Sequence, residues 1–137
     1  MRAETALNAV LNAAAGVTAL VGSGAAARIY PGELPLGTAL PALCLEHVSG
    51  GELTTIDAAS NYGLVQSRMQ VTAIAKTYPE VKTVLEQVRL ACNYQRGTFG
   101  GVNVVSIVRE LIGPDLRDPA LGLYSQSLDF MVTLKEQ

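Results

Sequence analysis

The sequence contains few charged side chains and no run of basic ones. Only 16% of its 137 residues are charged, and the net charge is -2, whereas an average soluble domain has about 25% charged residues. Binding to nucleic acid through its phosphates requires clustered lysine or arginine, so we do not expect such binding. Much of the surface must therefore be uncharged, which is typical of surfaces that partner proteins cover.

Long apolar runs are also missing. Glycine, asparagine or a charged residue interrupts each apolar stretch well before the roughly 20 residues that a membrane-spanning helix needs. The first residues have no basic flank leading into an apolar signal core. We therefore expect a soluble protein that is neither inserted into a membrane nor exported.

Cysteine and histidine are scarce, with two cysteines, Cys44 and Cys92, and one histidine, His47. The cysteines have no CxxC or Cys/His spacing, which favours two reduced, buried thiols over a disulfide or a zinc site. Glu46 would point to the opposite side of a strand from His47. Residues that are close in the sequence therefore form no catalytic pair or metal site.

The remaining motifs also lack the context that chemistry requires. The glycines of residues 22–24 follow no strand and precede no Gly-Lys-Ser/Thr sequence, so they indicate the end of a helix and not a phosphate-binding loop. The acidic residues Asp57, Glu110, Asp115 and Asp118 have no spacing that would pair their carboxylates. We expect solvated charges there, and neither a cofactor nor an enzymatic reaction.

The length predicts one domain covering residues 1–137. A compact chain of this size has a radius of gyration of about 14 Å, too small to enclose a wide channel. A pore would require several copies.

Two stretches have the spacing of amphipathic helices. Apolar side chains in residues 3–14 recur at the i, i+3, i+4 and i+7 positions of one buried face, and residues 17–21 would add one further turn. A second helix begins at Thr77, which has capping-box spacing to Glu80, and ends before Gly97.

Four stretches are predicted as strands: residues 42–48, 64–75, 102–111 and 122–134. An extended, proline-containing arm precedes the first of them. The predicted fold is α+β, in the order α-β-β-α-β-β, with two helices packed on one face of a four-stranded, largely antiparallel sheet. The other face of the sheet would stay available for assembly.

Residues 49–63 are rich in Gly, Thr, Ser, Asp and Asn, which predicts a long exposed loop that becomes ordered on a partner. The next strand places alternate polar side chains on the face away from the helices. The candidate assembly contacts are Thr54, Thr55, Ile56 and Asp57 in the loop and Gln66, Arg68 and Gln70 on the strand.

A series of short motifs occurs in a characteristic order along nearly the entire chain. The motifs are Arg28-Ile29-Tyr30-Pro31, Leu40-Pro41-Ala42, the strand Ser67-Arg68-Met69-Gln70-Val71, Tyr78 before the second helix, Gly100-Gly101-Val102, and Gly122-Leu123-Tyr124 with Ser127-Leu128-Asp129-Phe130. In this order they resemble the phage tail completion, or tail terminator, proteins of long-tailed phages and prophages, a family formerly described as a domain of unknown function.

The resemblance implies a structural protein of the phage tail or neck, assembled in the cytoplasm of a bacterial host. Such proteins form a ring, usually of six copies, on the last ring of the tail tube. The ring stops tube growth and docks to the head-tail connector or stopper protein. The implied partners are further copies of the chain, the tail tube protein and the connector. DNA would pass through the ring without sequence-specific binding, and no cofactor is implied.

Two alternatives stay open at this point. The chain would also suit another neck or tail-tube component that stacks as rings. A third hypothesis is a small enzyme or ligand-binding domain whose site brings together His47, Glu46 and Arg68.

Overall fold

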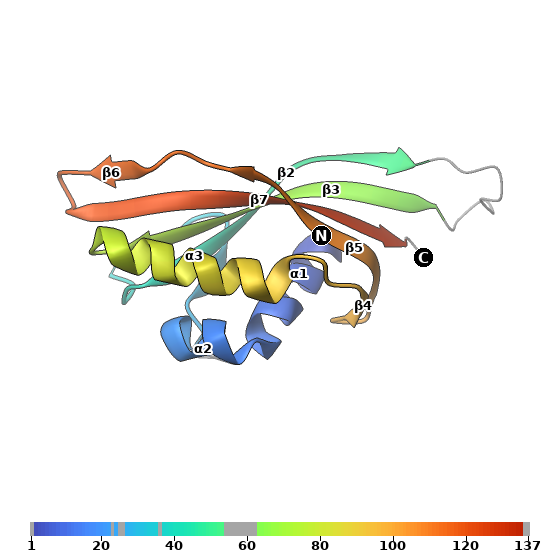
Figure 1. Ribbon diagram of the computed structural model, residues 1–137, viewed down its shortest axis with the longest axis horizontal. Helices are drawn as coiled ribbons and strands as arrows, with labels where there is room; N and C mark the ends of the chain where they lie inside the picture. Colours follow the sequence, from blue (N-terminus) through green and yellow to red (C-terminus); the bar gives the residue numbers. More distant parts are fainter. Residues whose placement is uncertain (1, 23, 25–26, 36, 54–62, 136–137) are drawn as a thin grey trace.

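The computed structural model describes residues 2–22, 24, 27–35, 37–53 and 63–135. These residues form one curled, mixed sheet with three helices on one of its faces (Figure 1). The helices are α1 (Arg2–Ala13), α2 (Ala15–Val21) and α3 (Tyr78–Cys92). The strands are β1 (Ile29–Pro31), β2 (Ala42–Leu53), β3 (Leu64–Ala75), β4 (Gly97–Phe99), β5 (Val102–Ile112), β6 (Leu116–Asp118) and β7 (Leu123–Lys135).

The predicted architecture of four strands and two helices is wrong. The strand order is β1-β2-β3-β7-β5-β4, and β6 pairs with β7 beyond the end of β5. β1 runs parallel to β2, while the other pairs are antiparallel. The strands that the sequence did not reveal, β1, β4 and β6, have three residues each. Strands this short show no alternating pattern.

The segment expected as one further turn after the first helix is a separate helix, α2, of seven residues. It meets α1 at an angle of 89°. Gly22 ends α2, and its N–H donates to the carbonyl oxygen of Thr18 (2.9 Å). No single helix in the described part of the chain is long and apolar enough to cross a membrane, although the bent pair α1 and α2 together is, by length and composition.

The helix side of the sheet forms the core. Met69 and Val71 of β3, Ile107 of β5 and Phe130 and Val132 of β7 are fully buried there. Complete burial of such side chains contributes about 1.5–3 kcal/mol each. The buried stripes of α1 and α3 pack on this layer, and they contain Ala3, Ala6, Leu7, Val10 and Leu11 on α1 and Val81, Val84, Leu85, Val88 and Cys92 on α3.

The expected loop at residues 49–63 is partly strand. β2 continues through Leu53, which pairs with Leu64. The register shifts between His47 and Ser49, which places one extra residue in β2, and the ladder to β3 then resumes. Backbone pairing to a strong neighbouring strand therefore outweighs the poor strand propensity of this Gly- and Ser-containing segment. The candidates Thr54, Thr55, Ile56 and Asp57 lie outside the described residues.

The two long hairpins end at opposite ends of the sheet (Figure 1). The end of β2 and the start of β3, where Leu53 pairs with Leu64, lie beside the C-terminal end of β7, because Leu64 also pairs with Lys135. The β6–β7 hairpin, in which Asp118 pairs with Leu123, closes at the other end. The helices lie beneath the part of the sheet between these hairpin ends.

Candidate assembly surfaces

The sheet face away from the helices carries a row of polar side chains on β3. Gln66, Arg68 and Gln70 alternate with Ser67 and Met69, which are buried on the helix side. This placement follows the alternation in the sequence. We refer to this side as the open face. Whether these three side chains contact other proteins stays a prediction.

An ion pair crosses the open face between β3 and β7. Arg68 Nε donates to Asp129 Oδ2 at 2.9 Å, and the two side chains are 31% and 7% exposed. The second carboxylate oxygen of Asp129 is buried and has no hydrogen-bond partner among the described residues. Arg68 is therefore already engaged within the chain, and no sequence pattern indicated its partner, 61 residues away.

Uncharged polar groups lie beside this pair. Gln70 Nε2 donates to Ser127 Oγ at 3.2 Å. Thr133 of β7 pairs with Gln66 and is only 7% exposed. The open face thus offers hydroxyl and amide groups around an ion pair at its centre, together with apolar side chains such as Met131, which pairs with Arg68, and Val108, which pairs with Met131.

A second polar network fastens α3 to the bend between β5 and β6. Lys82 Nζ donates to Asp115 Oδ1 and to Gln126 Oε1, both at 2.5 Å. Tyr78 donates its hydroxyl to Asp115 (3.1 Å), and Gln126 Nε2 donates to the carbonyl oxygen of Gly113 (2.8 Å). The hydrogen bond from Lys82 lowers the pKa of Asp115 and raises the pKa of Lys82. This network fixes the direction in which the β6–β7 hairpin leaves the core.

The residues of the enzyme hypothesis do not converge. His47 pairs with Met69, so it lies on the helix side, whereas Glu46 pairs with Gln70 on the open face with Arg68. The sheet separates the histidine from the other two. In the described part of the chain, no group of three or more His, Cys, Asp or Glu residues is placed to hold a metal ion.

Two of the acidic candidates, Asp115 and Asp118, have structural partners. Asp115 belongs to the α3 network described above. Asp118 Oδ1 accepts hydrogen bonds from the backbone N–H groups of Ala120 and Leu121, so it shapes the β6–β7 turn. Asp57 lies outside the described residues.

Both cysteines are buried and free, as their sequence positions predicted. Burial raises the pKa of Cys92 to about 12. Burial, together with the negative charge of Glu46, also raises the pKa of Cys44. Neither thiol is therefore activated as a nucleophile at neutral pH.

Comparisons with known proteins place the chain in a family. The family model described as tail completion protein gp17 matches residues 5–135. A chain in a solved structure described as "Virion of native gene transfer agent (GTA) particle" has the same fold, with a TM-score of 0.68 and 15% identity over 98% of this chain and 94% of that chain. No curated protein matches the chain. Because the family model spans residues 5–135, this chain belongs to the tail completion protein gp17 family and is a structural protein of the phage virion, located in its tail or neck.

Proposed function

We propose that copies of this chain form a closed ring, of six copies, at the head-facing end of a phage tail tube. The ring ends tube growth and docks to the head-tail connector or stopper protein, with DNA passing through its centre. Membership of the tail completion family supports this role. The chain is too small to surround a channel alone, with an expected radius of gyration of about 14 Å, so the role requires several copies.

The observation that carries the proposal is the one-sided covering of the sheet. α1 and α3 bury one face, while the open face has no covering layer among the described elements (Figure 1). Its centre is charge-balanced through Arg68 and Asp129. A face with hydroxyl and amide groups and little net charge is suited to contact neighbouring subunits or the tube without strong repulsion.

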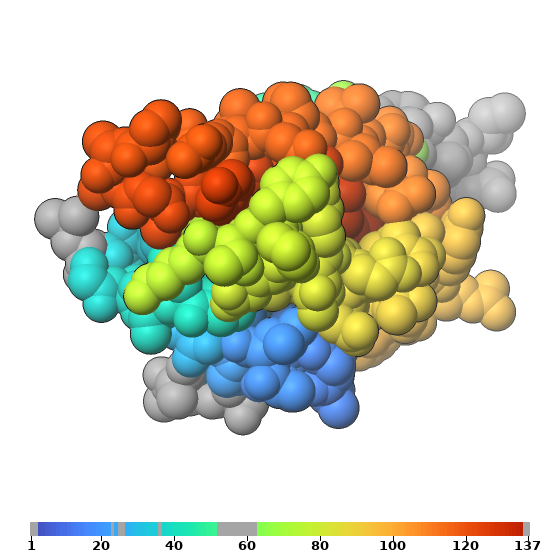
Figure 2. Space-filling view, turned by 60° about the vertical axis from the view of Figure 1, so that its left-hand side comes forward, coloured from blue at the N-terminus to red at the C-terminus, as the bar shows by residue number. Residues whose placement is uncertain are grey.

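The space-filling view shows that α3 and the β5–β6 segment together form a continuous surface on another side of the molecule (Figure 2). That side is held by the Lys82 and Asp115 network. Its elements are tied to one another before assembly, so we expect this side to keep its shape while the open face makes the contacts.

The position and copy number of the chain in particles test the proposal. We expect electron microscopy to show a single ring at the upper end of the tail. Quantitative mass spectrometry should give one ring's worth of copies per particle. Many stacked rings per tail would instead identify a tube component, and absence of the chain from purified particles would exclude both structural roles.

A matched pair of variants tests the open face. Gln66→Arg adds charge to the open face, and Thr83→Arg adds the same charge to the exposed side of α3, where the Thr83 hydroxyl donates to the carbonyl oxygen of Pro79 in the same helix. Both variants should melt near the parent temperature. Only Gln66→Arg should reduce the yield of completed tails joined to heads. Equal yields from the two variants would contradict a contact role for the open face.

A further inference from the structure

Two stretches of strand edge are unpaired in the described structure, and we infer that they bind each other in neighbouring copies of the chain. The first, the β2 edge, comprises residues 46–53. The second, the β5–β6 edge, comprises residues 111–118. The β2 edge of one copy pairs antiparallel with the β5–β6 edge of the next. This inference deepens the proposed ring and rests on it, because it names the surfaces by which the ring closes.

The β2 edge is unpaired because β1 is short. β1 pairs only with Leu43, Cys44 and Leu45. The N–H of Gly32 then donates to the carbonyl oxygen of Leu45 (2.8 Å), and the chain leaves the sheet. From residue 46 onward no described strand pairs with β2 on this side. Its outward backbone groups are therefore available to another strand.

The β5–β6 edge begins where other segments of the chain stop pairing with the outer side of β5. β4 pairs with β5 only as far as Val104. Farther along, Ile107 exchanges backbone hydrogen bonds with Tyr94 and Gln95, and the N–H of Arg109 donates to the side chain of Asn93 (3.0 Å). Beyond this point, β5 and β6 pair with β7 on one side and with no described strand on the other.

Three large aliphatic side chains are exposed on the β5–β6 edge and make it apolar. Leu111, Ile112 and Leu116 are 49%, 55% and 59% exposed. Ile112 pairs with Leu128, a core residue, so its side chain is on the helix side of the sheet. Exposed aliphatic side chains on an unpaired edge are a recognised site for pairing with another chain.

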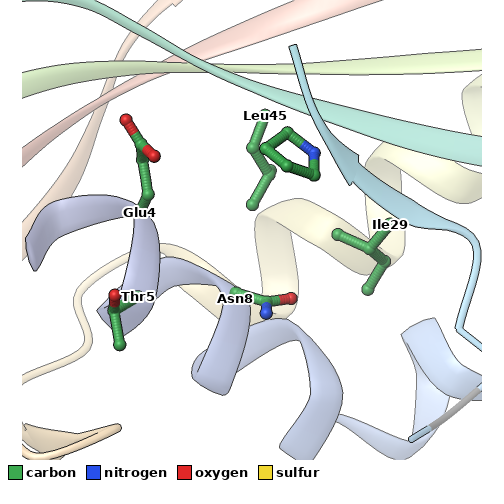
Figure 3. A pocket seen from close by; sticks show the side chains of 6 residues that line it. Glu4, Thr5, Asn8, Ile29 and Leu45 are labelled. Atoms are coloured by element: carbon green, nitrogen blue, oxygen red, sulfur yellow. The ribbon is translucent and has the colours of Figure 1, made fainter. Parts of the chain in front are cut away.

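A cleft lies beside the start of the β2 edge (Figure 3). It has a volume of about 280 Å³ and lies between α1 and the first two strands, where Ile29, Pro31 and Leu45 supply its apolar wall. A neighbouring hollow of about 340 Å³ shares Pro31 and Leu45 and extends to Glu46 and His47 at the start of the β2 edge. In the antiparallel pairing, residue 118 of the adjacent copy lies opposite residue 46 and residue 111 opposite residue 53, so Arg117 and Asp118, and not Ile112, come nearest to this cleft.

Strand direction agrees with the pairing. Each of the neighbours β2, β3, β7 and β5 runs antiparallel to the next, so β2 and β5 run in opposite directions. Rotating a copy about an axis roughly along the strands then brings the two edges together as an antiparallel pair. Such a contact joins two different surfaces, which is the arrangement that generates rings.

The position of the edges adds a constant offset between copies. The β2 edge lies at the end of the sheet where Leu64 meets Lys135, and the β5–β6 edge lies toward the other end, where Asp118 meets Leu123 (Figure 1). Pairing them therefore staggers each copy relative to the last. A regular stagger between strands is what closing a sheet into a barrel requires.

Bulges and proline are also features by which proteins protect strand edges from pairing, and the chain has register shifts near Val48 and Glu110 and a proline at Pro114. Protection and pairing predict different behaviour of the same variants. If the edges are protected, charges placed on them leave assembly unchanged. If the edges pair, a charge on either the β2 edge or the β5–β6 edge prevents assembly.

The test uses one variant for each edge. Val48→Asp places a charge on the β2 edge, where Val48 is 51% exposed, and Ile112→Asp places one on the β5–β6 edge. Leu90→Asp, on an α3 position that is 57% exposed, is the matched control. Circular dichroism and thermal melting establish that each variant folds, and Leu116→Asp replaces Ile112→Asp if that variant does not.

Native mass spectrometry at concentrations where the parent chain assembles gives the result. The parent and the control should form closed rings, and each edge variant alone should be monomeric, with assembly weakened at least tenfold. An equimolar mixture of the two edge variants should form heterodimers and nothing larger, because it contains one intact pair of edges per two chains.

Other outcomes overturn the inference. Rings formed by either edge variant would show that its edge is not used, and homodimers of one variant would show that like edges pair. A parent chain that stays monomeric at millimolar concentration would also contradict it. The proposed function has a separate criterion: edge variants that still form the terminal ring in particles refute the edge pairing alone, whereas absence of the parent chain from particles refutes the function.

Discussion

Gly100 and Gly101, in the turn between β4 and β5, provide a matched test of how α1 docks on the sheet. Both have left-handed φ angles, of +58° and +78°. A Cβ atom on Gly100 would lie 3.0 Å from Thr5 Cγ2, 3.2 Å from the Thr5 carbonyl oxygen and 3.4 Å from Ala9 Cβ, all on α1. A Cβ atom on Gly101 would meet nothing within 4 Å. Alanine therefore causes similar backbone strain at both positions and a collision at only one.

We expect Gly101→Ala to lower the free energy of unfolding by about 1–2 kcal/mol, the usual cost of a left-handed alanine. Gly100→Ala should cost about 1–3 kcal/mol more, because overpacking is added to the strain. Denaturant unfolding measures both values. Thr5→Ser removes the nearest methyl group, so it should recover part of the additional loss in a double-mutant cycle. Equal losses at the two glycines would refute the close packing of α1 on this turn.

Three further predictions concern the core, the thiols and the α3 network. Leu85→Ala should cost about 2–5 kcal/mol through the cavity it leaves, whereas Leu90→Ala on the exposed side of the same helix should change stability by less than about 0.5 kcal/mol; similar losses in chemical denaturation would contradict the burial of Leu85. Cys92 should resist alkylation in the folded protein, because burial raises its pKa to about 12, and should be labelled after unfolding without reductant, as intact mass would show; a cysteine that stays unlabelled would indicate a disulfide. The hydrogen bond from Lys82 lowers the pKa of Asp115, so their interaction stabilises the fold above the ordinary carboxyl pKa. This stabilisation is lost as the pH falls through the lowered pKa. Asp115→Asn should therefore flatten the acid side of the curve of unfolding free energy against pH, and an unchanged curve would be evidence against this interaction.

The elements with strong periodicity were predictable from the sequence. The limits of β3, Leu64–Ala75, agree with the predicted strand, and α3 begins at Tyr78 directly after the predicted cap, Thr77. The predicted strand at residues 102–111 differs from β5 by one residue at its end, and the predicted strand at residues 122–134 differs from β7 by one residue at each end. In each case one side chain series is committed to the core and the other is not, so the period is visible in the residue types.

The missing parts depend on tertiary pairing. β1 forms because the arm at Ile29 lies against Leu43 of β2, and β6 forms because Leu116 reaches Ser125 of β7. Neither segment has a periodic pattern of its own. The extension of β2 to Leu53 has the same cause. Short or glycine-containing strands of this kind derive their stability from a partner strand that is distant in sequence, so local patterns do not reveal them.

Prediction of the candidate site was limited in the same way. The alternation in β3 correctly placed Gln66, Arg68 and Gln70 on one face. It did not reveal that Asp129 pairs with Arg68, or that Lys82 reaches Asp115, because these contacts join elements across the folded sheet. The sequence therefore predicted which side chains share a face and not which of them are already engaged.

The burial of polar groups on the open face affects where assembly contacts can form. Asp129 and Thr133 lie on this face and are nonetheless 5% and 7% exposed, so neighbouring side chains on the curled sheet already cover its centre. A neighbouring copy gains little from these hidden groups or from Arg68, which is committed to an ion pair, so we expect the exposed side chains of the open face to contact the tube. The unpaired backbone of residues 46–53 and 111–118 lies at the margins of the same sheet. Contacts between copies are therefore expected at these margins, where backbone donors, acceptors and aliphatic side chains are still accessible.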